Sequence, residues 1–196
     1  SITPVSDGGF LLGGSSNSNI SNDKSDSNRG GWDFWIVKIN GNGVKQWDKT
    51  FGGTDNDYLN TIITTPDAGF ILGGLSYSTI SNEKSGNSRG SGDFWVIKSN
   101  SLGEKQWDKT FGGLLFEDLR KAIVAPDGSV LLAGHSSSNA SNDKSESNRG
   151  DFDFWIVKIN QNGVKQWDKT FGGTREEQLN SMLITVTADN SFLIGG

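Results

Sequence analysis

Oxygen-bearing side chains gather in this chain at spacings that suit two kinds of chemistry. The stretch SNDKSDSNRG at 21–30 returns at 81–90 and 141–150 with small changes, and it carries the oxygen ligands that hard cations prefer. Acids also follow each QWDKTFGG segment, and two carboxyl groups about 5–10 Å apart would suit glycoside hydrolysis. The acids available for such a pair are Asp55, Asp57, Glu117, Asp118, Glu176 and Glu177.

Calcium is the first cation to test against the repeated stretch. With Asp23 as the first ligand of an EF-hand loop, Asn28 stands where the glycine belongs and Phe34 where the closing glutamate belongs. Lys24 and Arg29 also bring positive charge into the loop. The pattern excludes an EF-hand. We expect no cofactor, with calcium in another kind of site as the alternative.

A structural role fits the stretch better. Its serine and asparagine side chains can bond neighbouring backbone groups and so fix an irregular loop. A guanidinium in the loop can bond backbone carbonyls or an acid of the adjacent repeat. We expect this clamping role of Arg29, Arg89 and Arg149.

Composition excludes several classes of function. The net charge is −5 and no basic stripe is present, so nucleic-acid binding is not expected. No apolar run approaches the roughly 20 residues that cross a bilayer, so membrane insertion is not expected either. The chain has no cysteine, and its one histidine, His135, has Ser15 and Leu75 as counterparts in other repeats. A thiolate site is excluded, and a zinc site or a catalytic triad is not favoured.

Internal repetition is the strongest signal in the chain. The motif DGGFLLGG at 7–14 has related copies that start at 67, 127 and 189. The motifs DFWIVKIN at 33–40 and QWDKTFGG at 46–53 recur with them. A repeat of about 60 residues indicates a stack or a ring of equivalent supersecondary units.

Each repeat predicts four short strands. In the second repeat the first strand is LNTIITT at 59–65, and GFILGG follows after a turn. DFWIVKIN is apolar on both faces and should be covered on both sides, whereas the alternating, lysine-bearing KQWDKTF suits an exposed outer edge. The segment EDLRKAIVA at 117–125 has some helical character, but its counterparts do not, so we expect a strand.

Repeated four-stranded antiparallel units predict an all-β fold, a β-propeller, with a β-solenoid as the alternative. The predicted blades are 1–58, 59–118 and 119–180, and 181–196 supplies only the inner strands of a fourth. Six tryptophans recur in register and are expected to pack the blades: Trp35, Trp95, Trp155, Trp47, Trp107 and Trp167.

The run GGFLLGG, DFWIVKIN and NGVKQWDKTFGG resembles the repeats of secreted and cell-surface proteins of Bacteroidota and some archaea. The layout is also similar to kelch-type blades. The resemblance implies a propeller, an extracellular or cell-surface location and an adhesive or binding role, without a catalytic motif. Because both ends supply inner strands, we expect the chain to belong to a longer polypeptide or to assemble with other copies.

The long Ser/Asn loops and the connections such as GGTDND at 52–57 should share one face of the fold, and the tight turns the other. Differences between the repeats gather on the loop face, where function commonly resides, although drift of exposed loops would look the same. Trp32 is the leading candidate for stacking on a ligand, unless it packs on its own loop. The other candidate ligand-binding residues are Phe152, Asp55, Asp57, Tyr58, Glu117, Glu176 and His135.

These observations favour a non-enzymatic extracellular module that binds a cell-surface glycan or protein within a larger protein. A purely structural spacer is the first alternative, since the repeats are nearly identical. A propeller-type glycoside hydrolase is the second alternative and the less favoured one.

Overall fold

The computed structural model describes residues 1–177, 183–187 and 191–195, and in these residues it contains strands and no helices. Sheet 1 comprises β1 (Ile2–Pro4), β2 (Phe10–Ser16), β3 (Asp33–Ile39) and β4 (Lys45–Phe51). Sheet 2 comprises β5 (Asp57–Thr64), β6 (Phe70–Ser76), β7 (Asp93–Ser99) and β8 (Lys105–Phe111). Sheet 3 comprises β9 (Glu117–Val124), β10 (Val130–Ser136), β11 (Asp153–Ile159) and β12 (Lys165–Phe171). Sheet 4 pairs β13 (Leu183–Val186) with β14 (Phe192–Gly195).

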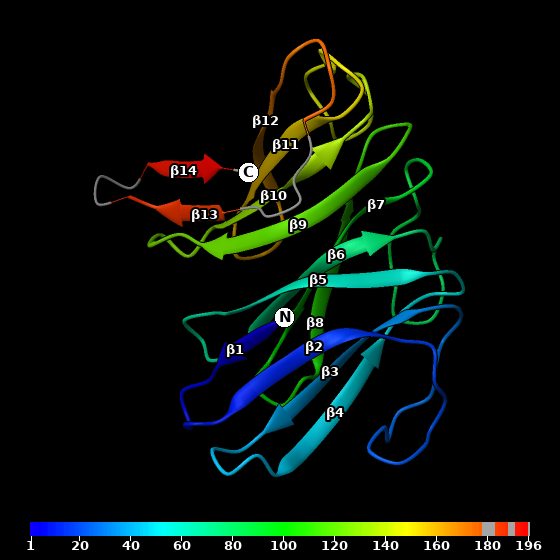
Figure 1. Ribbon diagram of the computed structural model, residues 1–196, viewed down its shortest axis with the longest axis vertical. Helices are drawn as coiled ribbons and strands as arrows, with labels where there is room; N and C mark the ends of the chain where they lie inside the picture. The colour runs from blue at the N-terminus through cyan, green and yellow to red at the C-terminus, as the bar shows by residue number, and fades with distance from the viewer. Residues whose placement is uncertain (178–182, 188–190, 196) are drawn as a thin grey trace.

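Every sheet is antiparallel, and its strands follow one another in chain order. The predicted all-β architecture of four-stranded antiparallel units is therefore confirmed, including the strand at Glu117–Val124. The sheets succeed one another along the molecule, and β5 and β9 lie side by side as the first strands of sheets 2 and 3 (Figure 1). No helix with the length and apolar character needed to cross a membrane occurs in the described part of the chain.

The sequence explains the strand pairs locally. Hairpins between the third and fourth strands turn at Gly43, Gly103 and Gly163, whose φ angles of 75–79° are in the left-handed region that glycine adopts without strain. The Asn40 side chain accepts hydrogen bonds from the backbone of Asn42 and Val44 and so closes the first of these turns.

Neighbouring sheets pack face to face through their apolar side chains. β7 is buried along its whole length, because sheets 1 and 3 cover its two faces, as the doubly apolar motif predicts. Trp95 packs against Phe34 of sheet 1 at a ring-centroid distance of 4.9 Å. Trp155 makes the equivalent contact with Phe94 of sheet 2 at 4.8 Å. One core thus lies in each gap between sheets.

Sheet 1 is covered on one face only. Trp95 and Ile97 are fully buried against sheet 1, whereas their counterparts Trp35 and Val37 are partly exposed. A cavity with a volume of about 590 Å³ lies on this face of sheet 1 beside Trp35. The face therefore has the side chains of an inter-sheet core, and none of the sheets in the described residues lies against it.

The fourth strands differ from the expected exposed edge. Asp48 and Thr50 of β4 are buried, because the long loop between β2 and β3 folds over them. Asp48 accepts hydrogen bonds from the Ser25 backbone and from Trp35 Nε1, and Lys24 Nζ donates to Thr50. The loop is thereby attached to its own sheet, and sheets 2 and 3 repeat the arrangement.

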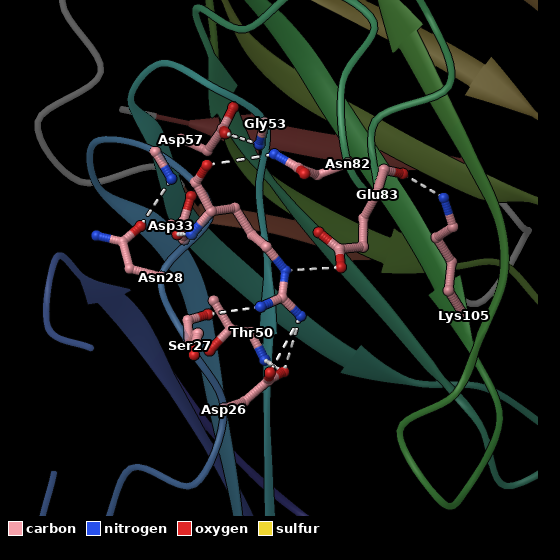
Figure 2. Close-up of polar contacts among 12 residues, drawn as sticks. Asp26, Ser27, Asn28, Asp33, Thr50, Gly53, Asp57, Asn82, Glu83 and Lys105 are labelled. Carbon is pink, nitrogen blue, oxygen red and sulfur yellow. Dashed lines mark hydrogen bonds and ion pairs between the residues drawn. The ribbon is translucent and has the colours of Figure 1, made fainter. Parts of the chain in front are cut away.

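Arg29 links the same loop to the long loop of the second repeat, and Figure 2 labels its partners Asp26, Ser27 and Glu83. Its guanidinium donates to Ser27 O at 2.7 Å, to the Asp26 carboxylate, and through Nε to Glu83 Oε1 at 2.8 Å. Glu83 belongs to the equivalent loop of the second repeat. Arg89 bonds Asp143 in the same way at 2.9 Å, whereas Arg149 donates to the carbonyl of Thr170. Successive loops are thus linked by charge-assisted hydrogen bonds.

Candidate functional site

The strands place all the long loops at one end of the sheets, together with the short connections between sheets. The long loops are 17–32, 77–92 and 137–152, the short connections are 52–56 and 112–116, and residues 172–177 are the described part of the connection after β12. We call this end the loop face. Backbone hydrogen bonds join the two kinds of segment: Tyr77 N donates to Asn56 O at 3.0 Å, and Glu117 N to Gly92 O at 2.8 Å.

Six ring side chains form a continuous row across the loop face, which we call the aromatic row: Trp32, Tyr58, Tyr77, Phe116, His135 and Phe152. Trp32 lies 6.5 Å from Tyr58, and Tyr58 lies 6.5 Å from Tyr77, measured between ring centroids. Phe116 continues the row at 6.3 Å from Tyr77. Phe152 and His135 end it, each 6.1 Å from Phe116. The row crosses from sheet 1 to sheet 3.

Local packing explains how Phe116 joins the row. Gly92 stands at the repeat position of Trp32 and Phe152, and a side chain there would meet the ring of Phe116 at 3.0 Å. Phe116 therefore occupies the space that the glycine leaves open, which joins the two halves of the row. Trp32 and Tyr77 remain 40% and 37% exposed, so part of each side chain is open to solvent.

His135 acts in the row as an uncharged ring. Burial between Phe116 and Phe152 lowers its pKa to about 4, and Arg120 adds to the effect while Glu176 opposes it. An imidazole of such low pKa is neutral throughout the physiological range.

We therefore expect the His135 ring signals in an NMR titration to stay unchanged between roughly pH 5 and 8. Assignment is immediate, because the chain has one histidine. Since the folded pKa is depressed, protonation favours the unfolded chain, and stability is lost as the pH falls from about 6.5 towards 4. A titration midpoint near pH 6.5 would place His135 in solvent and contradict the row.

Polar groups border the aromatic row at its centre. Burial raises the pKa of Asp118 to about 6, although Arg120 lies 3.0 Å away and Asn60 donates a hydrogen bond to it. Burial and the charge of Asp118 raise the pKa of Tyr77, so its hydroxyl stays protonated and able to donate. A ligand on the row would thus meet ring faces and hydrogen-bonding groups together.

Two of the sequence candidates lie beneath the surface. Asp57 and Glu117 are fully buried, and each accepts a hydrogen bond from a backbone N–H, of Gly53 and Gly113 respectively, at 2.7 Å. Ser78 and Ser136 donate further hydrogen bonds to these two carboxylates. Asp57 and Glu117 therefore hold the connections between sheets in place and do not reach the loop-face surface.

The remaining candidates separate into those in the row and those beside it. Trp32, Tyr58, His135 and Phe152 come together in the row, and Asp55 and Glu176 lie exposed on the neighbouring connections. No group of three or more histidine, aspartate or glutamate side chains is arranged to hold a metal ion within the described residues.

Sequence reasoning missed Tyr77 and Phe116, which join the two ends of the row. The signal was present, because Tyr77 has Asn17 and Ser137 as its counterparts, and Phe116 has Asn56 and Glu176. Both are positions where the repeats differ on the loop face. The contact that unites them depends on how sheets 2 and 3 are placed, which the repeat pattern alone does not give.

No known family model matches the chain, and no curated protein is significantly similar to it in sequence.

Proposed function

We propose that the sheets are consecutive blades of a β-propeller. The support comes from their packing: the first strands of neighbouring sheets lie together, and the middle sheet is covered on both faces. The bare face of sheet 1 presents the same side chains that sheets 2 and 3 bury against their neighbours. A further blade, from a longer chain or from a second copy, would cover it.

The loop face of this propeller carries the ligand, and the protein is a non-enzymatic binding module. The single observation behind this proposal is the aromatic row. Its rings occupy positions that differ between the repeats, although repetition would be expected if they only packed the blades. Burial of Asp57 and Glu117 also removes two of the acids on which a hydrolase would depend.

A glycan of the cell surface is the ligand class that suits the row best. The C–H groups on one face of a sugar ring are weakly positive and stack on the negative face of an aromatic ring. Trp32 and Tyr77 are partly exposed and offer such faces, and the Tyr77 hydroxyl can donate a hydrogen bond to a sugar oxygen. The resemblance to repeats of secreted and cell-surface proteins supports an extracellular setting.

A protein partner is the second candidate, and the two leucines before Phe116 favour it. Leu114 and Leu115 are 66% and 52% exposed at the edge of the aromatic row. Exposed aliphatic side chains beside tyrosine and tryptophan are typical of protein-binding surfaces.

The proposal predicts that Trp32→Ala and Tyr77→Ala each weaken binding about tenfold or more, since removing a stacking anchor costs over roughly 1–2 kcal/mol. Binding is measured first for the unaltered protein on a glycan array and on cells, and then for the variants on the bound glycan or cell.

Trp167→Ala is the matched control, because Trp167 is an equally exposed tryptophan on β12, outside the row. Equal losses for Trp32→Ala and Trp167→Ala would remove the row from the binding surface. An unaltered protein that binds neither glycans nor cells would favour the structural spacer.

A further inference from the structure

A cavity other than the one on sheet 1 lies at the opposite end of the strands from the aromatic row. It has a volume of about 420 Å³ and opens between sheets 2 and 3, beside the tight turns. Trp107 forms one wall, Ile71 and Val130 form the floor, and Asp67 and Lys98 stand at the rim. Ligand pockets are commonly about 300–1,000 Å³ in volume, so the cavity is large enough for a small molecule.

A single departure from the repeat explains this cavity. Between sheets 1 and 2 the equivalent tryptophan, Trp47, packs against Phe70 at a ring-centroid distance of 6.5 Å. Between sheets 2 and 3 the counterpart of Phe70 is Val130. Valine is smaller than phenylalanine, so the space beside Trp107 that a phenyl group would fill forms part of the cavity.

Exposed amide groups border the cavity, and no side chain of the described residues pairs with them. In sheet 1, Gln46 accepts a hydrogen bond from Lys38 at 2.8 Å. Its counterpart Gln106 has no hydrogen-bond partner among the described residues, and the same holds for the side chain of Gln161 and for the indole N–H of Trp107. Amide groups both donate and accept, so they can pair with hydroxyl groups of either orientation.

The charges at the rim cancel. Lys98 pairs with Asp67 at 2.9 Å, and Thr65 also donates to this carboxylate. Burial opposes ionisation of Asp67, but the hydrogen bonds from Thr65 and Lys98 lower its pKa to about 2, so the pair stays ionised near neutral pH. The cavity therefore combines an aromatic plane, free amides and no net charge.

We propose that this cavity binds one neutral sugar residue, with its apolar face on Trp107 and its hydroxyls on Gln106 and Gln161. The combination of an indole plane with unpaired amides suits a molecule that is apolar on one face and polar at its edge. The site is distinct from the aromatic row and does not depend on it.

The test uses NMR of the whole chain, in which the seven tryptophans give separate indole N–H signals. Glucose, galactose, mannose and N-acetylglucosamine are each titrated to about 50 mM, enough to saturate a millimolar site. We expect at least one sugar to shift the Trp107 signal saturably and to leave that of Trp47 unchanged. The double variant Trp32→Ala/Tyr77→Ala should show the same shift, because the aromatic row is elsewhere.

Val130→Phe is the decisive variant, since it introduces the residue found at the equivalent position 70. It should abolish the saturable shift while the thermal midpoint of unfolding is maintained. Gln106→Ala, at an exposed position, should weaken the affinity at least fivefold even if the larger change disturbs packing. The proposal is overturned if no sugar shifts the Trp107 signal, or if the shift persists in both variants.

Discussion

Replacing Asp108 with alanine is expected to lower the free energy of unfolding by roughly 3–5 kcal/mol, the cost of removing one partner from a buried charged network. Asp108 lies on β8 and accepts hydrogen bonds from Trp95 Nε1 at 3.1 Å, from the Ser85 backbone at 2.9 Å and from Lys105 at 2.8 Å. Alanine would leave the fully buried indole N–H of Trp95 without an acceptor and would remove one of the attachments of the long loop to sheet 2.

The measurement is equilibrium unfolding in urea, followed by tryptophan fluorescence. Asp127→Ala is the matched control, because Asp127 is an exposed aspartate paired with Lys158, and its loss should cost below about 1 kcal/mol. Equal effects of the two substitutions would mean that the loop is not held by Asp108.

The network also predicts how acid destabilises the protein. Burial opposes ionisation of Asp108, but hydrogen bonds from Lys105, Ser85 and Trp95 outweigh it and lower its pKa. Since the folded pKa is depressed, the stabilisation is complete above the unfolded pKa of about 4 and is lost as the pH falls further. This acid-dependent loss should be smaller in the Asp108→Ala variant.

Gly134→Ala is expected to lower the free energy of unfolding by about 3 kcal/mol, because there is no room for the added methyl group. A Cβ atom at Gly134 would lie 2.0 Å from the Asp118 carbonyl oxygen and 2.8 Å from the Phe94 ring. The carbonyl belongs to the neighbouring strand β9, where the register shifts between Ala133 and Gly134. Relief would require the two strands to separate.

The repeat supplies a control for this prediction at the same position in sheet 1. A Cβ atom at Gly14 meets nothing within 4 Å. Gly14→Ala should therefore change stability by less than about 1 kcal/mol, and in the stabilising direction if the unfolded chain loses entropy. Thermal unfolding of both variants checks the difference. A Gly134→Ala protein as stable as Gly14→Ala would contradict the close approach of β9 and β10.

Much of the fold follows from the sequence because it is determined locally. The apolar motif at 33–40 and its copies predict strands covered on both sides; β7 is such a strand, whereas one face of β3 is partly exposed. Asn-Gly pairs predict the tight hairpins that turn at Gly43 and Gly163, and the equivalent hairpin of the second repeat turns at Gly103 after a leucine. The strands and turns themselves depend on neighbours within about ten residues, so pattern and turn chemistry are sufficient for them, whereas coverage of a strand depends on the neighbouring sheets.

The site was only partly predictable, because its contacts join different repeats. Trp32 and Phe152 stand out in the sequence, but Tyr77 and Phe116 link them only once the sheets are packed. The sequence predicts that Asp57 and Glu117 bind a ligand on the loop face, but both are buried. Acids in a loop suggest solvent exposure, yet here they accept backbone hydrogen bonds inside the fold.

The central claim is that these sheets are an arc of a propeller and that the bare face of sheet 1 needs another blade. Light scattering after size exclusion, at several protein concentrations, tests it most directly. For these 196 residues expressed alone, we expect a β-rich protein with a mass at least twice the chain mass of 21.1 kDa, because the open face beside Trp35 is then left for a second copy to cover. A folded species that stays at 21.1 kDa at every concentration would contradict the claim.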